Sequence, residues 1–207
     1  MQIIDTVFLV AILIMSVVIH EVAHGYVAYK LGDNTAFYAK RLTLNPIRHL
    51  DPFGSVFLPL ILALSGTGLV FGWAKPVPYN PNNLRNGARG EIMVAIAGIV
   101  VNLFIAIFFS IVLRLAISYG FINDALMFVL PTIVIINLLL AIFNLMPIPP
   151  LDGSRILFST LGERYRNIGY AMERYSLIFI VLFIVFVWKY IAPVVSHLFI
   201  FLTGLNL

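Results

Sequence analysis

The chain has 207 residues, of which 61% are hydrophobic and only 11% are charged. A soluble domain of this length does not need so many apolar residues, so the composition excludes most soluble classes and predicts a polytopic membrane protein, folded as one membrane-embedded domain over residues 1–207. The net charge of +4 then indicates loop orientation and not nucleic-acid binding, and the absence of cysteine leaves only nitrogen and oxygen ligands for any metal.

The first apolar run extends from about Ile3 to Tyr29 and is long enough to cross a bilayer. Only a helix can carry such a run through lipid, because each backbone N–H and C=O group must be satisfied within the segment. Gly32, shortly after the run, is typical of a residue that ends a helix. We therefore expect the chain to open with a transmembrane helix.

A metal-binding pattern stands near the end of this run, where residues 20–24 read His-Glu-Val-Ala-His. His20 and His24 are four residues apart and lie on one face of a helix, and Glu21 borders the same face. This spacing is typical of the helix of a zinc metalloprotease, in which the glutamate is the general base. A polar cluster between helices is the alternative, and a metal site needs a third ligand.

The segment Ser55–Phe71 is apolar but short, and Pro59, Gly66 and Gly68 interrupt it. A helix needs about 20 residues to cross a bilayer, so we expect a re-entrant element here, with a fifth span as the alternative. The proline-rich residues that follow are expected to be extended. Gly68–Pro78 is a candidate edge strand that could pair with an unwound substrate.

Three further apolar runs, about Ile92–Ile117, Leu126–Leu145 and Leu177–Phe201, complete four predicted spans. The connectors 30–51, 75–91 and 154–174 are basic, whereas the loop 118–124 holds one acid and no base. If Ser55–Phe71 re-enters, all three basic connectors lie on one side, as the positive-inside rule requires. The predicted fold class is an all-α bundle of four full transmembrane helices, a re-entrant element and a short extended or β-like stretch.

Asp152 is the candidate third ligand. It follows a break in which Pro147, Pro149 and Pro150 prevent a regular helix, and Gly153 lets the backbone turn. In the predicted topology Asp152 lies at the same cytosolic depth as the two histidines. Two imidazoles and one carboxylate leave a position open for water, which is typical of catalytic zinc. The alternative is that Asp152 caps a helix beginning at Ser154.

His20–His24 and Asn144–Gly153 together resemble the site-2 protease family of intramembrane zinc metalloproteases, specifically the small prokaryotic members without a PDZ domain. The resemblance implies that His20, His24 and Asp152 bind Zn²⁺ and that Glu21 is the general base. Ala97–Asn102 is similar to the family's Ala-Gly-Pro-x-x-Asn segment, with Ile99 where the family usually has proline.

Two amides on the other spans, Asn102 and Asn144, are candidates for binding a substrate strand or the carbonyl oxyanion. Their alternative role is hydrogen bonding between helices, worth about 0.6–2 kcal/mol. His49 and Asp51 could orient a group of the site, but we favour a structural role in a turn.

The expected function is hydrolysis of peptide bonds within or next to transmembrane segments, in a prokaryotic plasma membrane with the active site toward the cytosol. The expected partners are transmembrane protein or peptide substrates and the lipid bilayer, with no nucleic acid; the sequence indicates no oligomeric state. One alternative is a membrane transporter, which also uses broken helices, although the chain shows no internal repeat. The other is a non-catalytic metal-binding membrane scaffold.

Overall fold

The computed structural model describes residues 3–51, 57 and 75–206. Among these residues, four helical segments are long and apolar enough to cross a membrane. They are α1 (Ile3–Lys30), α4 (Ala88–Ser118), α5 (Asp124–Leu145) and a last segment formed by α8 (Ser176–Leu182), the π-helical η4 (Phe183–Val187) and α9 (Trp188–Thr203). The predicted all-α class with four spans is confirmed for the described part of the chain.

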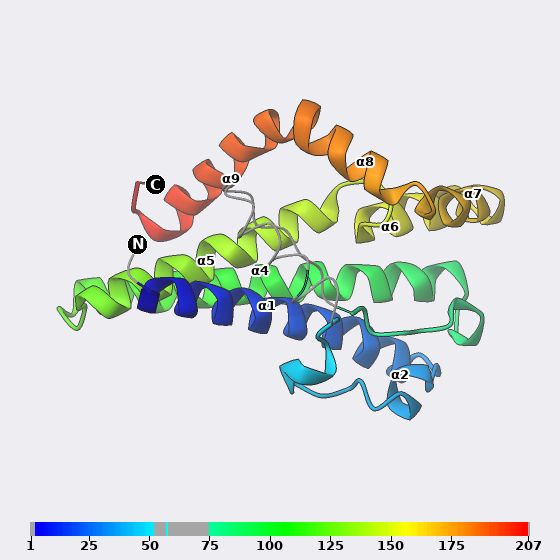
Figure 1. The fold of residues 1–207 in the computed structure, drawn as a ribbon, viewed down its shortest axis with the longest axis horizontal. Coiled ribbons are helices and arrows are strands. Elements are labelled where there is room, and N and C mark those ends of the chain that lie inside the picture. The colour runs from blue at the N-terminus through cyan, green and yellow to red at the C-terminus, as the bar shows by residue number, and fades with distance from the viewer. Residues whose placement is uncertain (1–2, 52–56, 58–74, 207) are drawn as a thin grey trace.

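Four shorter elements gather at one end of the bundle (Figure 1). They are α2 (Thr35–Tyr38), η3 (Pro81–Asn83), α6 (Asp152–Leu161) and α7 (Glu163–Glu173), whereas η1 (Pro46–Arg48) lies beside α1. Both termini and the connection from α4 to α5 lie at the opposite end. The long helices therefore alternate in direction, and the three basic connectors join them at the end that holds α2, α6 and α7.

Two predictions fall largely outside the described residues. Ser55–Phe71, expected to re-enter the membrane, is described only at Phe57 and stays a prediction. Of the expected edge strand Gly68–Pro78, only residues 75–78 are described, and they form neither helix nor strand. An extended or β-like stretch is therefore not confirmed.

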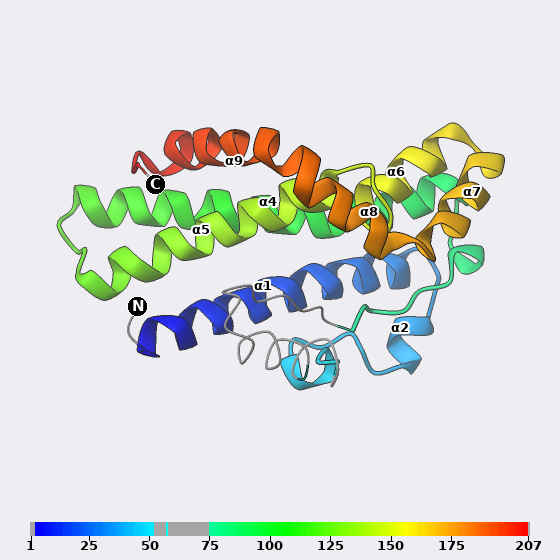
Figure 2. The same cartoon turned by 45° about the horizontal axis from the view of Figure 1, so that its top comes forward.

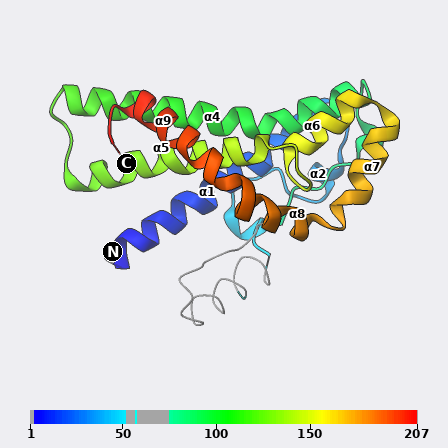
Figure 3. The same cartoon turned by 90° about the horizontal axis from the view of Figure 1, so that it is seen from above.

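The centre of the bundle is the pair α4 and α5, with α1 and α9 on different faces of it (Figures 2 and 3). A buried apolar cluster joins α4, α5 and α9, and consists of Ala106, Val134, Leu138, Ile142, Val195 and Phe199. Large apolar side chains such as Phe104 and Phe201 remain exposed on the outside. Such an outer surface is suited to contact with lipid, because lipid keeps these side chains out of water where the protein does not bury them.

A polar pair joins α1 to α5 within this apolar bundle. The amide nitrogen of Asn137, which is fully buried, donates to Ser16 Oγ at 2.9 Å and to the Ile133 carbonyl oxygen at 2.9 Å. A polar group at such a depth has no water to bind, so a partner on the next helix holds the two helices in register.

We predict that Asn137→Leu lowers the free energy of unfolding by about 0.6–1.7 kcal/mol, because the bond to Ser16 is lost. The measurement is denaturation with sodium dodecyl sulfate in mixed micelles, followed by circular dichroism. Ser16→Ala and the double variant complete a cycle, and a coupling energy of zero between the two positions would contradict the prediction.

Candidate metal centre

Two imidazoles meet on one face of α1, as their spacing predicts. His20 and His24 are 4% and 7% exposed, and their rings pack edge to face with centroids 4.6 Å apart. The two Nε2 atoms are 3.0 Å apart. Both lone pairs can therefore point at a single position beside the helix.

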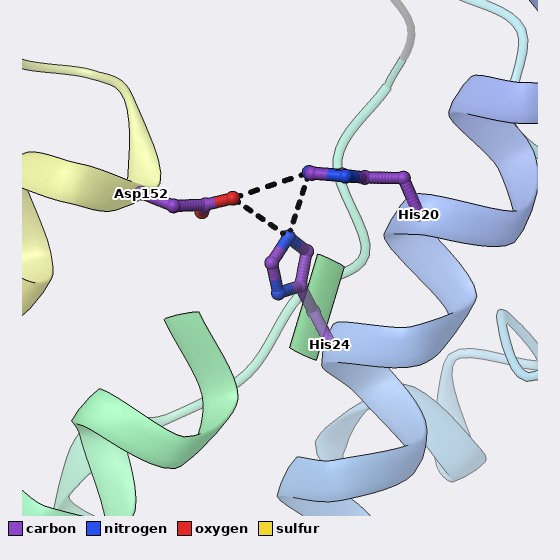
Figure 4. Close-up of side chains that lie close together, drawn as sticks. All are labelled: His20, His24 and Asp152. Atoms are coloured by element: carbon purple, nitrogen blue, oxygen red, sulfur yellow. Dashed lines mark hydrogen bonds and ion pairs between the residues drawn. The ribbon is translucent and has the colours of Figure 1, made fainter. Parts of the chain in front are cut away.

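Asp152 reaches the same position from α6 (Figure 4). Its Oδ2 atom lies 3.2 Å from the Nε2 atom of His20 and 3.2 Å from that of His24. The helix α6 begins at Asp152 itself, with Leu151 as its N-cap and no side-chain capping bond. The alternative that Asp152 caps a helix beginning at Ser154 is therefore wrong.

The three atoms fit a zinc ion. Two ligands bound to zinc at about 2.0–2.1 Å and at the tetrahedral angle lie about 3.3 Å apart. The observed separations, 3.0 Å between nitrogens and 3.2 Å from each nitrogen to oxygen, are close to this value. Asp152 Oδ2 is also buried without a hydrogen-bond partner among the described residues, which is costly unless a cation binds there.

A bond to α4 fixes the protonation of His24. Its Nδ1 atom lies 2.7 Å from the backbone oxygen of Val94. A carbonyl oxygen can only accept, so Nδ1 carries the proton and Nε2 presents its lone pair to the shared position. The Nδ1 atom of His20 has no such partner within the described part of the chain.

The charge state of Asp152 also suits a ligand. Burial raises the pKa of its carboxyl, but the favourable electrostatic interaction with the adjacent imidazoles of His20 and His24 outweighs burial and holds the pKa below its ordinary value. The side chain is therefore a carboxylate at neutral pH, as metal binding requires.

Two glycines let the elements approach closely enough to form the site. A Cβ atom on Gly98 of α4 would lie 2.5 Å from His20 Cε1 and 2.5 Å from His24 Nε2. A Cβ atom on Gly153 would lie 2.1 Å from the backbone oxygen of Leu145 at the end of α5. Neither position can hold a side chain without moving a ligand or the start of α6.

A cavity of about 270 Å³ opens beside the ligands. It is lined by His20, Glu21, His24, Pro76, Val77, Pro78, Tyr79, Val94, Ala95, Asn144, Pro150, Asp152 and Arg155. Glu21 Oε2 accepts a hydrogen bond from the backbone N–H of Val77 at 2.9 Å, which orients the carboxylate within this cavity. The candidate base and the three candidate ligands therefore share one space.

The two candidate amides are placed differently. Asn144 lines the cavity, and its Nδ2 atom donates to the Leu140 carbonyl oxygen at 2.9 Å. Asn102 does not line the cavity. It is fully buried on α4, four residues after Gly98, and neither amide atom has a hydrogen-bond partner among the residues described.

His49 and Asp51 do not line this cavity either. His49 is buried, and its Nε2 atom lies 2.8 Å from the Thr43 backbone oxygen. Its own carbonyl oxygen accepts the backbone N–H of Lys75 at 2.8 Å. His49 therefore holds the loops around the site and does not contact the three ligands.

Arg155 and Tyr79 are cavity residues that the sequence did not point out. Arg155 donates to the Tyr79 hydroxyl, and its Nη2 atom pairs with Glu173 Oε1 at 3.2 Å. A usable signal existed for Arg155, because a residue three positions after Asp152 on a helix shares its face. Tyr79 carried none, since it lies outside any helix or strand.

Comparisons with known proteins agree on one family. The model of peptidase family M50 matches residues 116–188. YwhC of Bacillus subtilis, named as a zinc metalloprotease, is 39% identical over 195 residues, which cover 92% of this chain and 83% of that protein. Rip2 of Mycolicibacterium smegmatis, also named as a zinc metalloprotease, is 33% identical over 83% of this chain and 64% of its own length.

A third relative, the zinc metalloprotease MJ0392 of Methanocaldococcus jannaschii, is 29% identical over 81% of this chain and 41% of its own length. The chain thus spans less than two thirds of the Rip2 and MJ0392 proteins, but most of YwhC. No solved structure matches the chain.

We predict that Gly98→Ala weakens zinc binding about 10- to 100-fold, the range seen when residues around metal ligands are changed, because the new methyl group displaces both imidazoles. The measurement is competition for zinc against a chelator of known affinity. Val100→Ala, on an exposed part of the same helix, is the matched control. Equal affinities of all three proteins would contradict the close approach of α4.

Proposed function

Because the chain belongs to peptidase family M50, the site-2 protease family of intramembrane zinc metalloproteases, we propose that His20, His24 and Asp152 bind its zinc ion and that Glu21 is the general base. The protein is a multi-pass integral membrane protein and a zinc metallopeptidase. The observation that carries the residue assignment is the convergence of three ligand atoms, 3.0–3.2 Å apart, beside a cavity that Glu21 lines.

The mechanism follows from the residues at the cavity. Zinc, when bound by two imidazoles and a carboxylate, lowers the pKa of a bound water to about 7 and polarises a carbonyl group. Glu21 accepts a proton from the attacking water and returns it to the nitrogen of the leaving amine. The Val77 N–H holds Glu21 Oε2, so the carboxylate is oriented before the substrate arrives.

Asn144 and Asn102 are proposed to contact the substrate. Asn144 lines the cavity and can bind a substrate backbone group with the part of its amide that Leu140 does not use. Asn102 is buried with both amide atoms unpaired among the described residues, an arrangement that costs about 1–3 kcal/mol. A substrate carbonyl or its oxyanion would bind this amide if the substrate segment enters beside α4.

The proposed substrates are transmembrane protein or peptide segments. A helix hides its peptide carbonyls, so the segment must unwind before Glu21 can assist its cleavage. The proposed contact for the unwound chain is the segment Gly68–Pro78. Pro76 and Pro78 have no N–H group, and the N–H of Val77 is bound to Glu21, so residues 76–78 offer the substrate only carbonyl oxygens.

The orientation remains part of the proposal. The basic connectors join the long helices at the end of the bundle that holds α2, α6 and α7, and the positive-inside rule assigns that end to the cytosol. We propose one membrane-embedded domain in a prokaryotic plasma membrane, with the metal centre toward the cytosol. Family membership does not favour the two alternatives, a transporter and a non-catalytic scaffold.

We predict that Glu21→Gln retains zinc and lowers the cleavage rate of a model transmembrane peptide by about 10²- to 10⁴-fold, since the amide cannot accept the proton. Zinc content and cleavage are measured on the same purified samples. Asp124→Asn, the same change at the far end of α5, should leave both values unchanged. Undiminished cleavage by Glu21→Gln would exclude Glu21 as the base.

The orientation can be tested directly, because the chain contains no cysteine that would react in the background. We predict that an impermeant maleimide, added outside intact cells, labels Phe121→Cys and does not label Tyr38→Cys. Both positions are 75% exposed. Tyr38 is the last residue of α2 and Phe121 lies in the connection from α4 to α5, at the opposite end of the bundle, so accessibility depends on the side alone. The reverse labelling pattern would refute a cytosolic metal centre.

A further inference from the structure

Residues 75–80, which we name the strap, pass beside the candidate site without forming a helix or strand, and three of their backbone N–H groups are hydrogen-bonded. The N–H of Lys75 donates to the His49 carbonyl oxygen at 2.8 Å. The N–H of Val77 donates to Glu21 Oε2 at 2.9 Å, and the N–H of Asn80 donates to Asp33 Oδ2 at 2.8 Å. The strap therefore joins the candidate base to a second carboxylate beyond the end of α1.

Asp33 is fully buried, yet its carboxylate has a complete set of neutral donors. Besides Asn80, Oδ1 accepts from Asn83 Nδ2 at 2.8 Å and from the hydroxyl of Thr35 at 2.6 Å, with a longer bond from the Thr35 N–H at 3.3 Å. Burial raises the pKa of Asp33, but these hydrogen bonds outweigh it and hold the pKa below its ordinary value. An ionised acceptor makes these bonds stronger than neutral ones.

The strap also lies directly on α1. Val77 is 5% exposed, and a Cβ atom on Gly25 would lie 2.5 Å from Val77 Cγ1. Gly25 is one turn of helix after Glu21, so close packing at Gly25 and the hydrogen bond at Glu21 act on the same residue of the strap. A shift of the strap must therefore move the Val77 amide relative to the Glu21 carboxylate.

We propose that Asp33 is a positioning residue for the catalytic Glu21: by binding Asn80 and Asn83 it fixes the strap whose Val77 amide orients the base. The inference rests on the proposed function, because it assigns Asp33 a role in the same hydrolysis. The carboxylate of Asp33 does not line the cavity, so it acts on Glu21 through the strap and not by direct contact.

Three substitutions separate this role from a general effect on the turn. Asp33→Asn keeps the shape of the side chain but replaces one acceptor oxygen by an NH₂ group. Because Asn80 and Asn83 bind different oxygens of Asp33, one of these two bonds is lost. Thr35→Val removes a hydroxyl that bonds the same carboxylate and leaves both bonds to Asn80 and Asn83 in place. Asn83→Ala removes a single bond to Asp33.

The test measures three quantities on the full-length protein in detergent micelles: amide hydrogen exchange of residues 75–83 by mass spectrometry, zinc content, and kcat and KM for a transmembrane peptide. For Asp33→Asn we expect faster exchange in 75–83, wild-type zinc content, and a kcat about 10-fold lower with KM within about twofold. The upper limit of the loss in kcat is the 10²- to 10⁴-fold that a general base contributes. The exchange rate and kcat of Asn83→Ala should lie between those of wild type and Asp33→Asn, and those of Thr35→Val should match wild type.

Several results would overturn the proposal. Unchanged exchange in Asp33→Asn would show that Asp33 does not hold the strap, and faster exchange with unchanged kcat would show that the strap does not position the base. Loss of zinc, or an equal effect of Thr35→Val, would indicate a structural role only. Failure of the proposed function can be distinguished from failure of this proposal. In that case the wild-type protein would cleave no peptide, while Asp33→Asn would still speed amide exchange in residues 75–83.

Discussion

The approach of α4 to α1 at Gly98 is the contact on which the candidate metal centre depends. The two imidazoles occupy the space that a side chain on Gly98 would fill, and the Val94 carbonyl oxygen of the same helix fixes the tautomer of His24. The same helix packs against α6, which carries Asp152. Because protein interiors are close-packed, the missing side chain at Gly98 sets how closely α4 approaches the two imidazoles of α1.

Three carboxylates, those of Asp33, Glu91 and Asp152, differ in the groups that stabilise them. Asp33 is satisfied by neutral donors from Thr35, Asn80 and Asn83, and the buried Glu91 accepts from the hydroxyl groups of Ser159 and Tyr170. Asp152 differs, since its Oδ2 atom faces two imidazoles and has no hydrogen-bond donor among the described residues. A buried charge without donors is expensive, so the contrast separates the carboxylate suited to a cation from those that hold the fold.

The sequence predicted those features that depend on one helix or on hydropathy. The spacing of His20 and His24, the four spans and the matching depth of Asp152 all follow from helical periodicity and loop charge. The contact at Gly98 and the bonds of Asp33 could not be predicted, because each joins segments distant in sequence, without a repeating pattern. The Arg155–Tyr79 contact could not be predicted for the same reason. Ser55–Phe71 lies largely outside the described residues and stays a prediction.

The prolines on both sides of Val77 have a further consequence for how the protein avoids pairing with copies of itself. Open backbone with free N–H and C=O groups is a template for aggregation between chains, and natural proteins block such edges with proline. Here Pro76 and Pro78 remove two donors and Glu21 takes the third. Two strap segments from neighbouring molecules would therefore bring acceptor against acceptor along Pro76–Pro78, and could not form a ladder there.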